Sequence, residues 1–429
     1  MRVPGDKSIS HRALMLAALG RGHSRVRGLL QSADVHSTAA VLRAMGVSIP
    51  DLDGPELVIE GVGLRGLTQP HADLDCGNSG TTARLMSGIV AGAQVEARFI
   101  GDDSLSRRPM RRVAAPLSAM GAQVDLPEHG GLPMTIRGAS LQGITWHAEV
   151  ASAQVKSAIL LAGLVGDVPV EVHEPAATRD HTERMLRARG VDLRTEGNVV
   201  SLNPSARLDA LDTEVPGDPS SAAFVAGLVA IGGAVSGNAG GASAGGRDAS
   251  LVRVENVGIN PARIGAFQVL RRMGAAIEFA NVADQGGEPV AMIVCRAGEL
   301  RGVTVSPDEV PSLIDELPLI ACVATRAVGE TRVTGAAELR VKESDRIRAV
   351  VENLRAIGAE AEELPDGFVV QGSDRPLKGR VVTHGDHRIA MAFGVLGALG
   401  GNAIEIDDPS CCAVSWPSFW DDLRSLSRG

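Results

Sequence analysis

The chain has 429 residues, of which 44% are hydrophobic, and it carries a formal net charge of −9. A chain of this length predicts roughly two to four domains with sizeable cores. The acidic balance and the aromatic content of only 2%, with no tyrosine, argue against a nucleic-acid partner. The longest nearly apolar run, 222–235, is shorter than the roughly 20 residues that cross a bilayer, so we expect no membrane partner. Five cysteines without a C-x-x-C pair predict a reducing, cytoplasmic location with neither disulfides nor a zinc site.

The first informative stretch in chain order is 4–12, PGDKSISHR, which stands before an apolar run. A helix that begins there directs its free N–H groups and its positive dipole end at whatever lies in front of it. Lys7 and Arg12 add full charges at the same place, and this combination suits a small phosphorylated anion. The alternative is a solvated basic helix start, in which Ser8 or Ser10 simply caps the helix.

Six apolar segments along the chain predict buried helices. Their starts lie near His11, Gly80, Gln154, Ser220, Asp315 and His387. A second, amphipathic segment follows each of them, and five of these segments end at a glycine that suits a left-handed helix stop. The glycines are Gly46, Gly121, Gly190, Gly274 and Gly358. Because the repeat is longer than the about 20–50 residues of solenoid repeats, it predicts a pseudo-symmetric fold of several domains. A glycine-rich stretch, 237–246, is interpreted as a flexible or inserted loop.

Several polar residues at the predicted helix starts suit anion or proton chemistry. Arg108 follows a turn at 101–104, and we expect Pro109 to open the next helix. The Arg108 guanidinium suits bidentate capture of a carboxylate or phosphate, although a solvated basic turn explains it as well. Arg388 at a helix start is unfavourable without an anion, and its neighbour His387 suits either proton transfer or a structural hydrogen bond. If pseudo-symmetry directs these helix starts to one place, they form a shared anion-binding surface.

Two further groups of charged residues are candidates for proton transfer. The stretch 342–346 is expected to start a helix, on which Glu343 and Arg346 share a face; a surface ion pair is the alternative. Asp315 and Glu316 stand between apolar residues, so these carboxylates are expected to be paired or to have raised pKa values that suit proton transfer. Capping of the next helical turn explains Asp315 and Glu316 equally well.

Taken together, nine stretches resemble the 5-enolpyruvylshikimate-3-phosphate synthase family. They are PGDKSISHR (4–12), GNSGTTARL (77–85), GDDSLSRRPM (101–110), ASAQVKSA (151–158), TRDHTE (178–183), PGDPSSAAF (216–224), IDELP (314–318), ELRVKESDR (338–346) and GDHRIAMAF (385–393). They follow the family's order and run nearly from end to end of the chain. The sequences of 152–158 and 178–183 are similar to those of the bacterial class associated with glyphosate tolerance.

The resemblance implies an α/β fold of the two-domain enolpyruvyl transferase type, built from six βαβαββ units with three units in each domain. The buried helices would point their N-termini at the cleft between the domains. The first domain is expected at 6–216, on the shikimate 3-phosphate side. The second is expected at 217–429 together with 1–5, on the phosphoenolpyruvate and catalytic side.

The implied reaction transfers the enolpyruvyl group of phosphoenolpyruvate to the 5-hydroxyl of shikimate 3-phosphate. Phosphate is released through a tetrahedral intermediate, and no cofactor or metal is implied. Asp315 would bind the hydroxyl, Glu343 would deliver a proton to the methylene carbon, and Lys7 completes the catalytic set. The implied contacts of shikimate 3-phosphate are Lys7, Ser8, Arg12, Ser152, Ala153, Gln154, Arg179, Asp315 and Lys342. The implied contacts of phosphoenolpyruvate are Lys7, Asn78, Gly80, Arg108, Gln154, Arg346 and Arg388. These assignments fit the chemistry, because two highly charged ligands need fixed cations and protonation of an enol ether needs a positioned acid.

The chain departs from the family's pattern at three places. Val414 stands where some members carry a lysine, so that cation is missing or replaced. Only residues 1–3 precede PGDKS, where the family usually has about one more strand, which would mean a shortened N-terminus. Gly80 stands where glyphosate-tolerant relatives often carry alanine. The glycine leaves room for the inhibitor and predicts sensitivity, whereas the class resemblance points to tolerance.

Two other functions compete with this interpretation. The related UDP-N-acetylglucosamine enolpyruvyl transferases use a loop cysteine, and the corresponding loop here, 101–110, has none. The other is a binding protein that kept the fold and lost the activity. The presence of Lys7, Arg108, Asp315 and Glu343 together argues against it. The expected partners are therefore small molecules, namely the two substrates and glyphosate as an inhibitor, and we expect a monomer.

Overall fold

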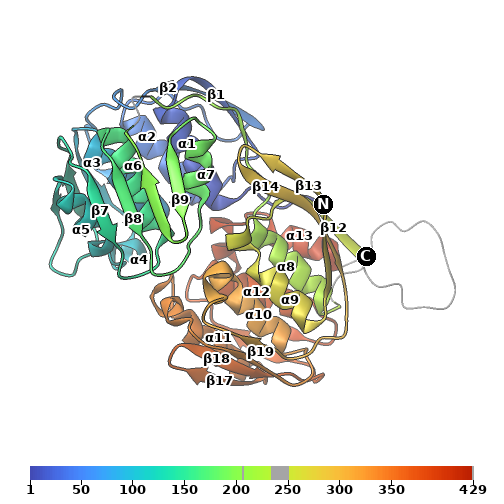
Figure 1. Cartoon of the computed structure of the whole chain (residues 1–429). Coiled ribbons are helices and arrows are strands. Elements are labelled where there is room, and N and C mark those ends of the chain that lie inside the picture. The colour runs from blue at the N-terminus through green and yellow to red at the C-terminus, as the bar shows by residue number, and fades with distance from the viewer. Residues whose placement is uncertain (205–206, 233–250, 428–429) are drawn as a thin grey trace. The chain divides into compact units, whose positions relative to one another are not determined.

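The computed structural model describes residues 1–204, 207–232 and 251–427, and the chain divides into two compact units (Figure 1). Unit 1 consists of Met1–Pro4, Pro216–Ala283 and Pro289–Gly429, and unit 2 of Gly5–Val215 and Asp284–Glu288. Each unit has its own hydrophobic core. The stretch 237–246, interpreted above as a loop, lies outside the described residues.

Unit 2 alternates short strands with helices along the chain. Its elements are α1 (Lys7–Leu19), β1 (Arg21–Arg27), α2 (Ala33–Ala44), β2 (Glu56–Val62), β3 (Leu74–Asp75), α3 (Gly80–Gly92), β4 (Glu96–Ile100), α4 (Asp103–Ser106), α5 (Arg111–Ala119), β5 (Gln123–Asp125), β6 (Met134–Arg137), β7 (Ile144–His147), α6 (Ala153–Gly166), β8 (Val170–His173), α7 (His181–Arg187), β9 (Leu193–Glu196), β10 (Val199–Leu202) and β11 (Thr213–Glu214).

Unit 1 continues the same alternation and adds several 3₁₀ turns, labelled η. Its elements are α8 (Pro219–Ala230), β12 (Leu251–Gly258), η1 (Pro261–Arg263), α9 (Gly265–Met273), β13 (Ala276–Gln285), β14 (Glu288–Arg296), β15 (Thr304–Val305), η2 (Val310–Ser312), η3 (Ile314–Glu316), α10 (Leu317–Ala324), β16 (Glu330–Val333), η4 (Ala337–Val341), α11 (Arg346–Ala356), β17 (Glu360–Leu364), β18 (Gly367–Gln371), β19 (Lys378–Val381), α12 (His387–Gly397), β20 (Ala403–Ile406), η5 (Pro409–Val414) and α13 (Phe419–Ser427). The turn between β13 and β14 is the segment assigned to unit 2.

The βαβαββ repeat is complete in three sheets of the described chain. Their strand orders are β3-β4-β6-β5, β7-β8-β10-β9 and β15-β16-β18-β17. In each, the first two strands are parallel and the remaining pairs are antiparallel. The other three sheets are smaller variants, with the orders β11-β1-β2, β12-β14-β13 and β19-β20. In the first, β11 comes from the far end of unit 2 and pairs parallel with β1; in the second, the parallel partner is reduced to a single bridge between Gly217 and Val257.

The six predicted apolar segments form the helices α1, α3 and α6 in unit 2 and α8, α10 and α12 in unit 1. Their side chains are buried nearly all round, as every residue of 155–165 in α6 shows, so these helices lie inside the units. Helices α3 and α6 pack closely enough that a side chain at Gly88 would lie 2.1 Å from the Ala158 carbonyl oxygen. The absence of a Cβ atom at Gly88 therefore permits this contact.

The predicted helix stops have the expected backbone conformation. The five glycines have positive φ angles of +91° (Gly46), +108° (Gly121), +81° (Gly190), +115° (Gly274) and +91° (Gly358). L-residues with a side chain rarely adopt this conformation. The second helix of five repeats is therefore ended by the same device.

Some predicted helix starts were wrong by a few residues. Helix α1 begins at Lys7, because Asp6 rather than Ser8 or Ser10 caps it and accepts a hydrogen bond of 2.9 Å from the Ile9 amide. Helix α10 begins only at Leu317, and Asp315 lies in the preceding 3₁₀ turn.

The loop and helix expected around Arg108 also differ from the structure. The turn expected at 101–104 contributes to helix α4, which Asp102 caps through the Leu105 amide at 2.8 Å. The following helix, α5, begins at Arg111 and not at Pro109. Similarly, α11 begins at Arg346, where the Asp345 carboxylate accepts from the Arg348 amide at 3.1 Å, so Glu343 precedes the helix.

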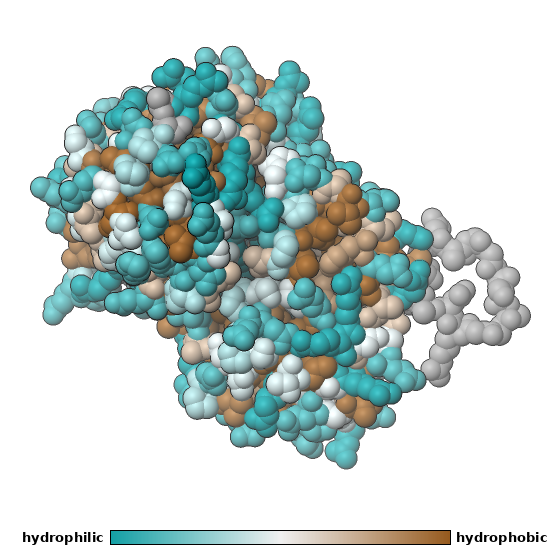
Figure 2. Space-filling view, viewed as in Figure 1, coloured by the Kyte–Doolittle hydropathy of each residue, from teal (hydrophilic) through white to brown (hydrophobic). Residues whose placement is uncertain are grey.

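Polar and charged residues cover most of the visible surface of each unit, and apolar residues form separate patches between them (Figure 2). Within the described ranges, no helix is long and apolar enough to cross a membrane.

Candidate active site

The predicted site residues of unit 2 gather at the N-terminal ends of three buried helices. Lys7 opens α1, Gly80 opens α3 and Ala153 opens α6. Ser79 caps α3 by accepting from the Thr82 amide at 3.1 Å, and Ser152 caps α6 by accepting from the Val155 amide at 3.4 Å. These ends carry the partial positive charge of the helix dipoles, which suits anions.

Lys7 forms an ion pair with a residue that the sequence did not single out. Its Nζ lies 3.0 Å from Asp34 Oδ2, in α2. The Lys7 side chain retains 21% of its exposure and that of Asp34 retains 9%. Asp34 therefore holds the ammonium group in place while one side of it stays accessible.

Arg12 is buried and is held by neutral oxygen atoms. Its Nε donates to Thr182 Oγ1 at 2.7 Å, and its two terminal nitrogens donate to Ser157 Oγ and the Ser8 carbonyl, each at 2.9 Å. Burial, opposed most strongly by the charge of Glu183, lowers the pKa of Arg12 to about 10. The guanidinium is thus still charged at neutral pH.

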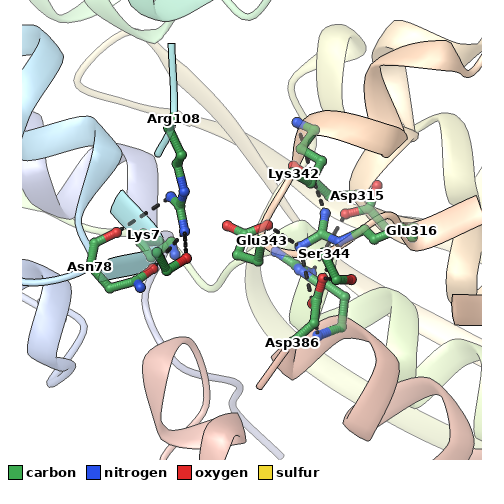
Figure 3. Close-up of polar contacts among 12 residues, drawn as sticks. Lys7, Asn78, Arg108, Asp315, Glu316, Lys342, Glu343, Ser344 and Asp386 are labelled. Carbon is green, nitrogen blue, oxygen red and sulfur yellow. Dashed lines mark hydrogen bonds and ion pairs between the residues drawn. The ribbon is translucent and has the colours of Figure 1, made fainter. Parts of the chain in front are cut away.

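Arg108 is anchored to the loop that precedes α3. It donates to Asn78 Oδ1 at 2.6 Å and, more weakly, to Ser104 Oγ at 3.3 Å (Figure 3). The Asn78 amide in turn donates to Asp102 Oδ2 at 2.7 Å. An ideal Cβ atom at Gly80 would lie 3.4 Å from an Arg108 nitrogen, so the glycine gives this guanidinium room.

Gln154 connects α6 to α3 through a residue that sequence reasoning missed. Arg84 donates to Gln154 Oε1 at 2.8 Å, and Gln154 donates to Thr81 Oγ1 at 3.0 Å. Of the remaining predicted residues, Ser8 lies in the first turn of α1 and Arg179 lies between β8 and α7, and both are half-buried.

In unit 1, one buried arginine gathers three carboxylates. Arg346 lies 2.6 Å from Glu343 Oε2, 3.1 Å from Asp315 Oδ1 and 2.8 Å from Asp386 Oδ2 (Figure 3). Burial lowers the pKa of Arg346, but the charges of Asp386, Glu343 and Asp315 outweigh burial and raise it above its ordinary value. The structure therefore brings the predicted proton donor Glu343 and the predicted hydroxyl-binding Asp315 onto one guanidinium.

Lys342 and Ser344 complete this cluster. Lys342 Nζ lies 3.4 Å from Asp315 Oδ1, and Ser344 Oγ donates to Asp386 Oδ2 at 2.9 Å. Asp386 also caps α12 by accepting from the Arg388 amide at 2.9 Å. Asp386 was quoted within a motif but given no role; its position at a helix start was the available signal.

Arg388 has a looser carboxylate partner than Arg346. A terminal nitrogen of Arg388 lies 3.9 Å from Glu316 Oε1, and no other carboxylate of the described chain lies within 4.0 Å of it. Ser220 donates a short hydrogen bond to the same Glu316 oxygen. The Arg388 side chain makes no hydrogen bond to any described residue, so its N–H donors are available to an anion.

The comparisons with known proteins agree over almost the whole chain. A family model described as EPSP synthase (3-phosphoshikimate 1-carboxyvinyltransferase) matches residues 1–423. The chain belongs to the EPSP synthase family. The 3-phosphoshikimate 1-carboxyvinyltransferase of Alkalilimnicola ehrlichii is 48% identical over 437 residues, which cover 100% of this chain and 94% of the relative. That of Sulfurihydrogenibium sp. is 46% identical over 433 residues, which cover 100% and 97%.

A solved structure supports the same assignment. The EPSP synthase from Acinetobacter baumannii matches with a TM-score of 0.86 at 41% sequence identity, covering 100% of this chain and 95% of that chain. The predicted family and fold class are therefore confirmed. The chain is an enolpyruvyl transferase of the shikimate pathway, and it acts on small-molecule substrates.

Proposed function

We propose that residues of unit 1 supply the proton chemistry of the enolpyruvyl transfer and that cations of both units bind the two anionic substrates. The observation that carries the proposal is the single guanidinium of Arg346, which holds Glu343 at 2.6 Å and Asp315 at 3.1 Å. Two carboxylates fixed by one cation keep separate positions and suit two separate tasks. This arrangement supports Glu343 and Asp315 in the catalytic set, and the partly accessible ammonium group of Lys7 supports its place there.

In the addition step, Glu343 gives a proton to the methylene carbon of phosphoenolpyruvate, whose C2 becomes electrophilic. The 5-hydroxyl oxygen of shikimate 3-phosphate, held by Asp315, bonds to C2 and passes its proton to the Asp315 carboxylate. The product is a tetrahedral intermediate that carries both groups. In the elimination step, the C–O bond to phosphate breaks and the phosphate takes the proton held by Asp315. The Glu343 carboxylate takes back a proton from the methyl carbon, and the double bond is restored. Lys7 stabilises the negative charge on the departing phosphate.

Shikimate 3-phosphate is assigned to the polar groups at the starts of α1 and α6, to Arg12 and Arg179, and to two residues of unit 1. They are Lys7, Ser8, Arg12, Ser152, Ala153, Gln154, Arg179, Asp315 and Lys342. Phosphoenolpyruvate is assigned to Lys7, Asn78, Gly80, Arg108, Gln154, Arg346 and Arg388. Support comes from the hydrogen bonds of Arg108 and Gln154 to residues near the start of α3 and from the available donors of Arg388.

The test is phosphate release on mixing the protein with both substrates, with Glu343→Gln as the altered enzyme. Glutamine keeps the shape of the side chain but has no acidic proton, so we expect a loss of about 10²–10⁴-fold in kcat. Calorimetric binding of shikimate 3-phosphate to Glu343→Gln checks that the binding site survives. Undiminished phosphate release in Glu343→Gln would refute its role as proton donor. Binding without turnover in the unaltered protein would favour the binding-only alternative.

Three finer points follow from the same interpretation. We propose that glyphosate inhibits the enzyme, because Gly80 leaves space beside Arg108.

We propose a monomer, which light scattering after size exclusion tests; a dimer mass at low protein concentration would contradict it. All five cysteines carry free thiols, which supports a reducing compartment such as the cytoplasm.

A further inference from the structure

A buried lysine behind Arg12 has no part in the reaction described above. Lys156, in α6, lies 2.7 Å from Glu183 Oε1 in α7 and 2.6 Å from Glu174 Oε2, which follows β8. All three side chains are at most 3% exposed. Thr178 donates to the other oxygen of Glu174 at 2.6 Å. Two carboxylates and one ammonium thus share a site that water does not reach.

This cluster and Arg12 are neighbours through the chain itself. Helix α1 contacts α7, and side-chain hydrogen bonds join both helices to Ser157 of α6, from Arg12 in α1 and with Thr182 in α7. Thr182, which accepts from Arg12 Nε, is adjacent in sequence to Glu183, and Ser157, which accepts from another Arg12 nitrogen, is adjacent to Lys156. Helices α6 and α7 therefore each direct one hydroxyl group to Arg12. A neighbouring residue of each helix carries the charge that pairs the two helices, Lys156 with Glu183.

Arg12 nevertheless forms no ion pair with Glu183. Within the described ranges no carboxylate lies within 4.0 Å of the Arg12 guanidinium, whose hydrogen bonds all go to neutral oxygens. The charge of Glu183 still reaches Arg12, since it is the strongest influence opposing the lowering of the Arg12 pKa by burial. Glu183 and Glu174 in turn raise the pKa of Lys156 above its ordinary value despite its burial.

We propose that Lys156 is a positioning residue for shikimate 3-phosphate, because it binds Glu183 and so keeps this carboxylate from pairing with Arg12. The positive charge of Arg12 then remains available to the substrate anion. Without Lys156, the Glu183 carboxylate is buried without a counter-charge. The charge of Glu183 already acts on Arg12, and a buried carboxylate without a partner is costly. Pairing with Glu183 would compete with the substrate, and the uncompensated negative charge would also repel it.

The inference rests on the proposed contact between Arg12 and shikimate 3-phosphate, and the experiment separates the two. Lys156→Met, which keeps the length of the side chain, is expected to raise the KM for shikimate 3-phosphate about tenfold or more. The KM for phosphoenolpyruvate and kcat should change less than about threefold, because the residue acts through Arg12 alone. Arg12→Met is measured in parallel.

The decisive variant is the double substitution Lys156→Met with Glu183→Gln. It removes the competing carboxylate together with its lysine, so the KM for shikimate 3-phosphate should return to within about threefold of the unaltered enzyme. A residue with only a structural role predicts the opposite, since a second substitution in the same buried network adds damage. Glu183→Gln alone should leave this KM unchanged or lower it, and this single variant keeps the proposal testable if Lys156→Met does not fold.

A matched control accounts for loss of stability as such. Asn353, in unit 1, is buried and its amide bonds the backbone of Val382 twice, at 2.8 Å each. Asn353→Leu should lower the melting temperature without changing the KM for shikimate 3-phosphate. If Arg12→Met leaves that KM unchanged, the proposed role of Arg12 fails. If Arg12→Met raises it but the double variant shows no recovery, or Glu183→Gln raises it, the inference about Lys156 fails.

Discussion

Two buried arginines, one in each unit, sit in opposite electrostatic surroundings. Among the described residues, Arg12 donates only to hydroxyl and carbonyl oxygens, and burial lowers its pKa to about 10. Arg346 contacts three carboxylates, and these raise its pKa although it is equally buried. The first arrangement leaves positive charge available to a bound anion. In the second, the positive charge holds three carboxylates in place. We therefore propose that Arg12 serves substrate binding in unit 2, whereas Arg346, besides its proposed contact with phosphoenolpyruvate, positions Glu343 and Asp315 in unit 1.

The largest expected effect concerns the stability of unit 1. Arg346→Met leaves Asp315, Glu343 and Asp386 without their common counter-ion, and we expect it to lower the free energy of unfolding by about 3–5 kcal/mol. Arg348→Met is the matched control. Arg348 lies on the same helix but is 66% exposed, and its one ion pair with a described residue is with Glu352; its cost should be at most about 1 kcal/mol. Denaturant unfolding of both variants provides the measurement. Similar losses in the two would remove the distinction between Arg346 and a surface arginine.

A smaller loss is expected from the same substitution in unit 2. Arg12→Met removes hydrogen bonds to Ser157 and Thr182, but these hydroxyls already lie 2.7 Å from each other and remain paired. The expected cost is therefore about 1–3 kcal/mol, below that of Arg346→Met, because no charge is left unpaired by loss of a direct partner. Parallel urea titrations decide the order. If Arg12→Met destabilises more than Arg346→Met, the contrast between the two arginines is wrong.

The local devices of the fold were predictable from the sequence. The six buried helices follow from apolar runs, and the five glycine stops follow from a repeated signature in which glycine alone adopts the required φ at little cost. The residues that cap the helices were harder to predict from the sequence. Asp6 rather than a serine caps α1, and Asp315 precedes α10 in a 3₁₀ turn, because several neighbouring polar residues offered equivalent caps on sequence grounds.

The contacts between distant segments were not predictable in the same way. Asp34 pairs with Lys7 and Glu316 faces Arg388, yet no local spacing relates the two members of either pair. Lys156 and Glu183 each stand in a quoted motif, but their pairing depends on how α6 packs against α7. The family resemblance supplied candidate residues for ligands. It did not supply the charged groups behind them, which only the packing reveals.

His11, next to Arg12 in the sequence, likewise contacts a neutral hydroxyl group, and its protonation state can be tested by pH. His11 is buried, its Nδ1 lies 2.6 Å from Thr38 Oγ1, and burial lowers its pKa from 6.5 to about 3. Between these two values the unfolded chain binds a proton that the native state does not, so stability is complete above pH 6.5 and falls as the pH decreases. In His11→Asn, the slope of unfolding free energy against pH in this window should decrease by up to about 1.4 kcal/mol per pH unit.

The same substitution at the exposed His23 controls for removal of an imidazole as such. Chemical denaturation is followed at several pH values within the window for both variants. An unchanged slope in His11→Asn would mean that His11 is protonated in the native state. A second buried cation would then stand beside Arg12, and the lowered pKa of His11 would be wrong.

The smallest expected effect concerns the room beside Arg108. An ideal Cβ atom at Gly80 would lie 2.8 Å from Arg84 Nη1 and 3.4 Å from Arg108 Nη1, and both contacts are with ends of flexible side chains. Gly80→Ala should therefore fold normally, with the two guanidinium groups displaced slightly. Glyphosate has one more chain atom between its two acidic ends than phosphoenolpyruvate, so we expect it to need more of this space. We expect the inhibitory concentration of glyphosate to rise about fivefold, or about 1 kcal/mol, with a smaller rise in the KM for phosphoenolpyruvate. Equal inhibition of the unaltered enzyme and Gly80→Ala would show that the glycine does not set glyphosate affinity. It would also show that a slightly displaced Arg108 guanidinium binds the inhibitor equally well.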